Sequence, residues 1–130
     1  MASDPLVIVL DTGALVAVDR GSAAMRELIA EARRTESVLV MPAVVLAQAW
    51  RAGPRQALLA RFLALPFVDV DLLTRKLWQA VGELCGRTGT SDVVDAAVVI
   101  CARARGARVV VTSDTSDLRK LDENLILRTP

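Results

Sequence analysis

The sequence contains no histidine among its 130 residues. Without an imidazole side chain, Ser-His-Asp triads, histidine acid–base catalysis and zinc sites with histidine ligands are all excluded. Any catalytic chemistry must therefore use carboxylates, hydroxyls, lysine, arginine or a metal ion.

Cysteine is scarce, with only Cys85 and Cys101 in the chain. Both lie in apolar segments with helical periodicity, which favours two buried thiols in a reducing compartment. No apolar run reaches the roughly 18–20 residues of a membrane helix, and the N-terminus lacks the basic stretch and apolar segment of a secretory signal. We therefore expect a cytoplasmic protein with no membrane association.

An excess of charge of one sign is also missing, because 16 Lys and Arg residues nearly balance 15 Asp and Glu residues, for a net charge of +1. The chain therefore has no polybasic tail. Its apolar content of 53% is sufficient for a compact core and argues against disorder. A chain of this length predicts a single domain over residues 1–130.

Short apolar runs alternate with segments of helical periodicity along the chain. Residues 6–10 form a continuous apolar run, which is typical of a strand buried on both faces, and shorter strands are predicted at 37–41, 67–70, 108–112 and 125–127. Segments with helical spacing of apolar residues lie at 14–19, 22–35, 43–51, 55–65, 71–86, 91–105 and 115–121. This alternation predicts an α/β protein with a central parallel sheet of four to five strands, covered by helices on both faces.

Individual residues refine the expected boundaries. Pro42 suits the first turn of the helix that follows the second strand. A break is expected at 86–89, after which the Thr-Ser pair at 90–91 is a candidate cap for the next helix. Gly106 is typical of the residue that ends such a helix.

Four aspartates are candidate site residues. Asp11 directly follows the first predicted strand, and the Ser113-Asp114 pair ends the fourth. Ligand sites in open α/β sheets form beyond the carboxyl ends of the strands, so both side chains are candidates for one site. Asp92 and Asp95 lie three residues apart in one predicted helix and therefore share a face. Clustered carboxylates repel one another unless a cation lies among them, and oxygen-only ligands favour Mg²⁺ or Mn²⁺.

Each of these residues has a structural alternative. Asp11 and Asp114 can cap or stabilise the turns that they begin, and Asp92 in a first helical turn interacts favourably with the helix dipole. Asp95 is harder to explain in this way because it lies inside the apolar segment VVDAAVVI, where an unpaired carboxylate is costly. The joint placement of the acids, rather than any one of them, predicts a metal site.

Three sequence segments, VIVLDTGAL, VMPAVVLAQAWR and TSDVVDAAVVICARARGARVVVTSDTSDLRKL, are followed by a closing apolar strand. Together they resemble PIN domains, and within that family the VapC-type toxins of bacterial toxin–antitoxin pairs. The resemblance covers nearly the whole chain. It implies a three-layer α/β/α sandwich, usually dimeric, with Mg²⁺- or Mn²⁺-dependent endoribonuclease activity on RNA. It also implies a small VapB-like antitoxin whose C-terminal segment covers the active site.

The resemblance assigns roles to particular residues. It implies Asp11, Asp95 and Asp114 as catalytic and metal-binding acids, with Asp92 as a further candidate for both roles. A glutamate usually supplies another acid on the helix after the second strand, and the matching residue here is Gln48. An amide oxygen can bind a metal ion but carries no charge and is not a general base. Gln48 therefore predicts weaker metal binding or altered activity.

Further side chains are implied around these acids. Thr12 and Thr112 match positions of polar support, and Asp117 lies nearby, where a turn or cap role is favoured. Trp50 either offers a surface to a dimer or antitoxin partner, or belongs to the core.

Two hypotheses of function follow. The first is metal-assisted hydrolysis of RNA phosphodiester bonds, with backbone contacts from Arg51, Arg55 or Arg61. These arginines have the alternative of forming a solvated helix face. The second hypothesis is a catalytically weakened PIN fold that acts as a binding module, and it is motivated by Gln48.

Overall fold

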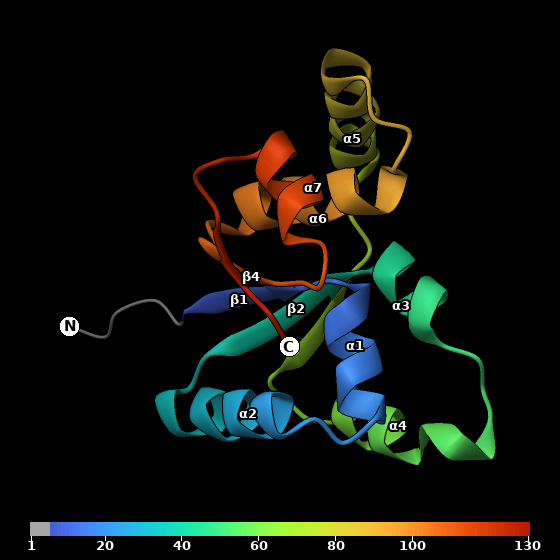
Figure 1. Cartoon of the computed structure of the whole chain (residues 1–130), viewed down its shortest axis with the longest axis vertical. Coiled ribbons are helices and arrows are strands. Elements are labelled where there is room, and N and C mark those ends of the chain that lie inside the picture. Colours follow the sequence, from blue (N-terminus) through green and yellow to red (C-terminus); the bar gives the residue numbers. More distant parts are fainter. Residues whose placement is uncertain (1–5) are drawn as a thin grey trace.

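A sheet of five parallel strands forms the centre of the protein in the computed structural model, which describes residues 6–130 (Figure 1). The strands are β1 (Val7–Leu10), β2 (Val38–Pro42), β3 (Val68–Asp71), β4 (Val109–Val111) and β5 (Ile126–Arg128). Their order across the sheet is β3-β2-β1-β4-β5, and every neighbouring pair is parallel. The predicted parallel sheet is confirmed, with five strands.

Helices cover both faces of the sheet, which confirms the three-layer α/β/α arrangement (Figure 1). One face carries α1 (Thr12–Asp19), α2 (Ala23–Thr35) and α4 (Ala57–Leu63), and the other carries α6 (Val93–Arg105) and α7 (Thr115–Leu121). Helix α3 (Ala43–Ala49) follows β2, and α5 (Arg75–Thr88) packs against α6. The short 3-10 helix η1 (Pro54–Gln56) precedes α4. Among residues 6–130, no helix combines the length and the apolar character required to cross a bilayer.

The inner strands β2, β1 and β4 contain only apolar residues, because helices exclude water from both of their faces. The largest contribution to the core comes from fully buried side chains such as Leu10, Leu39 and Val110. Helix α6 lies directly over this sheet and is buried from Asp95 to Ala102. The carboxylate of Asp95, in the first turn of this apolar helix, is therefore buried inside the protein.

The boundaries of α5 differ from the prediction at both ends. The helix begins at Arg75 rather than at 71, because Asp71 is the last residue of β3 and the Thr74 side chain caps the helix. The break predicted at 86–89 is also wrong in extent. The helix continues to the residue before Gly89, which ends it with a left-handed φ of 74°.

The caps of two other helices differ as well. The cap of α6 is Asp92 rather than a residue at 90–91, since Asp92 Oδ1 accepts a hydrogen bond from the backbone N of Asp95 at 3.0 Å. The Thr90 hydroxyl instead accepts a bond from the backbone N of Asp92 at 3.1 Å. Pro42 is the last residue of β2 and precedes α3 with an extended backbone, so it is not in the first helical turn.

The two cysteines are both free thiols. Cys101 is buried in α6 as predicted, whereas Cys85 is only half-buried, because it lies on α5 at the periphery of the helical layer. Burial raises the pKa of the Cys101 thiol to about 12, and the neighbouring Asp71 carboxylate adds to this shift. Cys101 is therefore an unreactive core residue.

The strand order reverses direction between β1 and β4, because β2 and β3 extend the sheet on one side of β1 while β4 and β5 extend it on the other. Such a switch point leaves a crevice beyond the carboxyl ends of the two strands. The backbone N of Asp11 donates to the carbonyl of Val111 at 2.9 Å, which holds these ends together. The segments that follow β1 and β4 are thus neighbours.

Candidate metal centre

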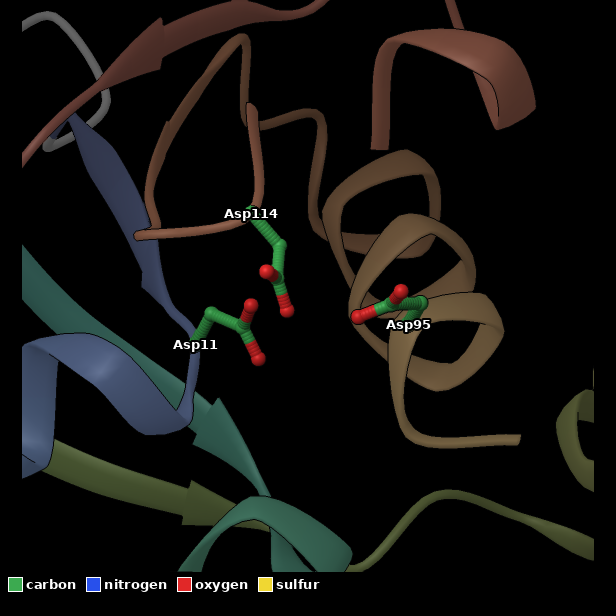
Figure 2. A group of neighbouring side chains, drawn as sticks. All are labelled: Asp11, Asp95 and Asp114. Atoms are coloured by element: carbon green, nitrogen blue, oxygen red, sulfur yellow. The ribbon is translucent and has the colours of Figure 1, made fainter. Parts of the chain in front are cut away.

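Three aspartates meet at this switch point (Figure 2). Asp11 follows β1, Asp114 precedes α7, and Asp95 extends toward both from the first turn of α6. One carboxylate oxygen from each residue lies within 4.8 Å of the other two. Asp11 and Asp95 are buried, with 3% and 4% of their surface exposed, whereas Asp114 is exposed. These three residues are called the acid cluster below.

Two hydrogen bonds hold the Asp11 carboxylate in place. Its Oδ1 accepts from the backbone N of Thr12 at 2.8 Å, which caps α1, and its Oδ2 accepts from the Thr112 hydroxyl at 2.8 Å. The buried Thr112 hydroxyl also accepts from the backbone N of Asp114 at 2.9 Å. The Thr112 hydroxyl therefore links the carboxylate of Asp11 to the backbone of Asp114. Each Asp11 oxygen keeps a further lone pair for a ligand, so capping and ligand binding are compatible.

Glycine at position 13 allows the first turn of α1 to touch the segment after β4. A Cβ added to Gly13 would lie 2.1 Å from the Ser113 hydroxyl oxygen and 2.9 Å from the Ser113 Cβ, both closer than real Cβ atoms approach. Ser113 immediately precedes Asp114. The missing side chain at Gly13 therefore permits the packing that places Asp114 beside Asp11.

Burial and mutual repulsion raise the pKa of both buried acids. Desolvation is the main cause of the raised pKa of Asp11, and hydrogen bonds from Thr112 and Thr12 partly offset it. Desolvation is also the first cause for Asp95, and the Asp92 charge is the second. Together with the other acids they raise the pKa of Asp95 to about 7. The acid cluster on its own therefore resists complete ionisation at neutral pH.

The acid cluster fits a divalent cation. Across residues 6–130, no Lys or Arg forms an ion pair with any of its three carboxylates. Two oxygens bound to one Mg²⁺ lie at most about 4.2 Å apart, which is twice the metal–oxygen distance. Neighbouring oxygens on the same octahedral ion lie about 2.9 Å apart, so oxygens that are already within 4.8 Å of one another need to approach by at most about 2 Å. Oxygen-only ligands favour Mg²⁺ or Mn²⁺ over zinc.

A model of the PIN domain matches residues 8–124, a span that contains the whole acid cluster. The chain belongs to the PIN domain family. No curated protein sequence shows significant similarity to it.

Three solved structures are similar to this PIN domain. VapBC2 from Rickettsia felis, bound to a DNA fragment from its promoter, has a TM-score of 0.73 at 19% identity, over 96% of this chain and 99% of that chain. VapC20 from Mycobacterium tuberculosis, a toxin that cleaves the sarcin-ricin loop, has a TM-score of 0.64 at 19% identity, over 85% and 93%. FitAcB from Neisseria gonorrhoeae has a TM-score of 0.54 at 16% identity, over 93% and 96%. At these identities the comparison establishes the fold.

Two predicted site residues of this PIN domain lie beside the acid cluster rather than in it. Asp92 is exposed, and its carboxylate caps α6, although its charge contributes to the raised pKa of Asp95. Gln48 is exposed on α3, where its Oε1 accepts a hydrogen bond from the Thr12 hydroxyl. The Gln48 amide therefore reaches the rim of the centre without adding charge.

The three arginines considered for RNA contact form no ion pair with the acid cluster. The Arg51 guanidinium donates to the backbone carbonyls of Trp50 and Ala47, so it folds back over the end of its own helix. Arg55 and Arg61 are exposed on η1 and α4. For these two residues, the alternative of a solvated helix face agrees with the structure.

Two further predictions concern Asp117 and Trp50. Asp117 is exposed in the first turn of α7, 3.9 Å from the Lys120 ammonium, in the position expected for a helix-stabilising acid. Trp50 is 38% exposed rather than part of the core. It lines an apolar hollow of about 370 Å³, together with Ala43, Leu46, Ala47 and Leu63.

Proposed function

We propose that this protein is a Mg²⁺- or Mn²⁺-dependent endoribonuclease and the toxin of a VapBC-type toxin–antitoxin pair. The observation that carries the proposal is the convergence of Asp11, Asp95 and Asp114 at the switch point, with no protein cation paired to them among residues 6–130. Membership of the PIN domain family supports it. So does the similarity of fold to VapC20, a toxin that cleaves the sarcin-ricin loop.

In this proposal the chain prepares a rigid anionic site for the ion and the phosphate. The Thr112 hydroxyl holds the Asp11 carboxylate and the Asp114 backbone next to each other, and Asp95 faces them from the first turn of α6. When bound, the ion supplies Lewis-acid activation of the phosphodiester and of the attacking water. The N-terminus of α1 begins beside Asp11, and the positive end of its dipole favours a phosphate there.

Cleavage of a single-stranded RNA in the presence of Mg²⁺ or Mn²⁺ tests this function. We expect the wild type to cleave, chelation by EDTA to stop cleavage, and Asp11→Asn to remove most of the activity. Asp117→Asn is the matched control, because Asp117 is an exposed aspartate outside the acid cluster. Equal rates for the wild type and Asp11→Asn, in a preparation free of contaminating nuclease, would overturn the proposal.

The proposed partner is a small VapB-like antitoxin. The similar structure from Rickettsia felis is a VapBC2 assembly. An antitoxin arginine that enters the acid cluster would pair with its carboxylates and compete with the metal. The apolar hollow at Trp50 offers a surface to this partner or to a second copy of the chain in a homodimer. Because RNA is the proposed substrate, we place the protein in the cytoplasm.

Co-expression with the small protein encoded by an adjacent gene tests the partner. We expect a stable complex whose RNA cleavage is inhibited. Light scattering of the isolated chain tests the homodimer in the same preparation. A neighbouring protein that neither binds the chain nor inhibits it would count against the pair.

A catalytically weakened PIN fold that acts as a binding module is the alternative, and Gln48 favours it. At the rim of the acid cluster, this side chain contributes an amide oxygen instead of a carboxylate. Calorimetric titration with Mn²⁺ discriminates the two functions. Binding that is saturated below millimolar Mn²⁺ supports the nuclease, and absence of binding at millimolar Mn²⁺ supports the binding module.

A further inference from the structure

A groove of about 540 Å³ runs along α1, away from the acid cluster. The α1 residues that line it include Thr12, Val16 and Arg20, which are spaced four apart and therefore form one row along the helix. Asp114 and Gln48 line the end of the groove at Thr12. The groove thus begins at the candidate metal centre and extends over two helical turns, or about 12 Å.

The far end of the groove holds its only positively charged lining side chain within the described part of the chain. Arg20 is the C-cap residue of α1 and is exposed. Its guanidinium forms no hydrogen bond or ion pair with residues 6–130, so its donors are free to bind a ligand. Between the two ends, Gly13 and Ala17 provide little side-chain volume, which keeps the groove open.

Three other arginines are engaged with groups of the protein itself. Arg51 donates to carbonyls of its own helix, Arg103 pairs with Asp122 at 3.0 Å, and Arg105 pairs with two carboxylates. Arg20 is distinguished from them by an unengaged guanidinium at the end of a groove that leads to the acid cluster.

We infer that this groove binds the RNA strand, and that Arg20 contacts a backbone phosphate a few nucleotides from the bond that is cut. The inference rests on the proposed nuclease function and extends it to a substrate path. A planar guanidinium binds a phosphate through two parallel hydrogen bonds. Contacts of this kind fix the register of a nucleic acid without reading its sequence. Arg20 is thus a residue that positions RNA across the acid cluster.

Binding of a fluorescent single-stranded RNA, measured by anisotropy in EDTA over a series of salt concentrations, tests this path. We expect Arg20→Ala to weaken binding about tenfold at low salt. We also expect the slope of log affinity against log salt to decrease by about 0.7, the value for one lost phosphate contact on a single strand. Arg20→Lys keeps the charge and is expected to retain most of that slope. The matched control is Arg34→Ala, since Arg34 is exposed on α2 and does not line the groove.

Cleavage kinetics provide a second readout on the same variants. Arg20→Ala is expected to raise KM while kcat stays at the wild-type value, because the contact holds substrate and transition state equally. The proposal is overturned if Arg20→Ala and Arg34→Ala both have the affinity and salt slope of a wild type that binds and cleaves RNA. In that case the nuclease function is still supported. A loss of affinity for single-stranded DNA alone would overturn RNA as the occupant. A wild type that binds RNA but cleaves none would contradict the nuclease function. The salt slopes of the variants would still show whether RNA binds in the groove.

Discussion

Two groups of aspartates in this fold have opposite electrostatic surroundings. Asp69 and Asp71 on β3 both pair with Arg105 from the end of α6, at 2.8 Å and 2.9 Å, and these residues are called the Arg105 cluster. The acid cluster beside β1 and β4 contains three carboxylates and has no arginine or lysine partner among residues 6–130.

The pKa shifts follow this difference. Burial tends to raise the pKa of Asp71, but hydrogen bonds from the Leu73 backbone and from Arg105 lower it below its usual value. No such compensation exists for Asp95, whose pKa is raised to about 7. This fold can therefore neutralise aspartates with its own arginine. Where it does not, as in the acid cluster, we expect an external cation to neutralise the carboxylates.

The largest predicted contrast comes from removing one charge in each cluster. Asp95→Asn is expected to reduce RNA cleavage about 10³-fold, because a metal ligand is worth several kcal/mol in the transition state. The same change is expected to raise the free energy of unfolding of the metal-free protein at neutral pH, since it removes a buried, repelled charge. Rates of RNA cleavage and thermal unfolding in EDTA measure the two effects.

Asp71→Asn is the matched variant, and we expect the opposite pattern. Its unfolding free energy is expected to fall by about 1 kcal/mol because half of a partly exposed ion-pair network is lost, and cleavage is expected to stay unchanged. Stability changes of the same sign in Asp95→Asn and Asp71→Asn would contradict the distinction between the two clusters.

Gly13→Ala is expected to weaken Mn²⁺ binding about tenfold, comparable to the loss of a group that orients a metal ligand. The added methyl group would collide with Ser113 and displace Asp114. Calorimetric titration with Mn²⁺ measures the change. The double variant Gly13→Ala/Ser113→Gly is expected to recover affinity, because it removes both of the closest atoms, which lie at 2.1 Å and 2.9 Å.

A control for Gly13→Ala is available in α5. Gly86 lies within that helix, and a Cβ added there meets no atom within 4 Å. Gly86→Ala is therefore expected to stabilise the protein by roughly 0.5–1 kcal/mol without changing Mn²⁺ affinity. If Mn²⁺ affinity is not restored in the double variant Gly13→Ala/Ser113→Gly, the proposed role of Gly13 in positioning Asp114 is wrong.

The pH dependence of stability is expected to follow the acid cluster in EDTA. The folded protein keeps Asp95 protonated up to a pKa of about 7, whereas the unfolded chain releases that proton near the usual aspartate pKa of 3.8. The folded state therefore binds the extra proton in this window, and stability falls as the pH rises from about 4 to 7. Burial raises the pKa of Asp11 as well, which acts in the same direction.

The Arg105 cluster has the opposite dependence. Because the pKa of Asp71 is lowered, its stabilising contribution is present above the usual pKa and is lost only as the pH falls through the folded value. Thermal unfolding in EDTA and in Mn²⁺ across this range measures both effects. We expect Mn²⁺ to stabilise the protein most at the alkaline end. A metal-free protein whose stability rises from pH 4 to pH 7 would contradict the raised pKa of Asp95.

Arg105→Ala is expected to lower the free energy of unfolding by about 1 kcal/mol, with the loss decreasing at high salt. The change leaves Asp69 and Asp71 without their common cation. Thermal unfolding at two salt concentrations measures the effect, and Arg34→Ala is the exposed control. RNA cleavage that fell with Arg105→Ala as steeply as with Asp95→Asn would show that the two clusters are not separate in function.

The smallest expected effect is that of Gln48→Glu. A carboxylate at this exposed rim position adds one charge near the acid cluster, and two charges about 4 Å apart in water interact by about 1 kcal/mol. We expect Mn²⁺ affinity to rise by less than tenfold. Titration of the wild type and the variant measures it, and an unchanged affinity would show that Gln48 does not face the bound ion.

The inner strands and two of the acids were predictable from the sequence. Apolar runs identify strands covered on both faces, and a residue that ends such a strand must lie at the carboxyl edge, as Asp11 and Asp114 do. The start of α5 was not predictable in the same way, because the Val-Asp-Val-Asp sequence of β3 continues directly into apolar residues. Only the Thr74 cap marks where the helix begins.

Long-range contacts account for what the sequence could not predict. Gly13 resembles any turn glycine until Ser113, a hundred positions away, is seen to pack on it. The row of Thr12, Val16 and Arg20 is visible in the sequence as spacing by four. Its proposed role in binding could not be predicted, because only the structure shows that a groove connects that face of α1 to Asp114.

The central claim is that the acid cluster, and not the Arg105 cluster, takes an external cation. Calorimetric titration with Mn²⁺ of the wild type, Asp95→Asn and Asp71→Asn tests it most directly. The account predicts binding by the wild type and Asp71→Asn, and loss of that binding in Asp95→Asn. Equal binding by the wild type and Asp95→Asn, or no binding by the wild type, would contradict it.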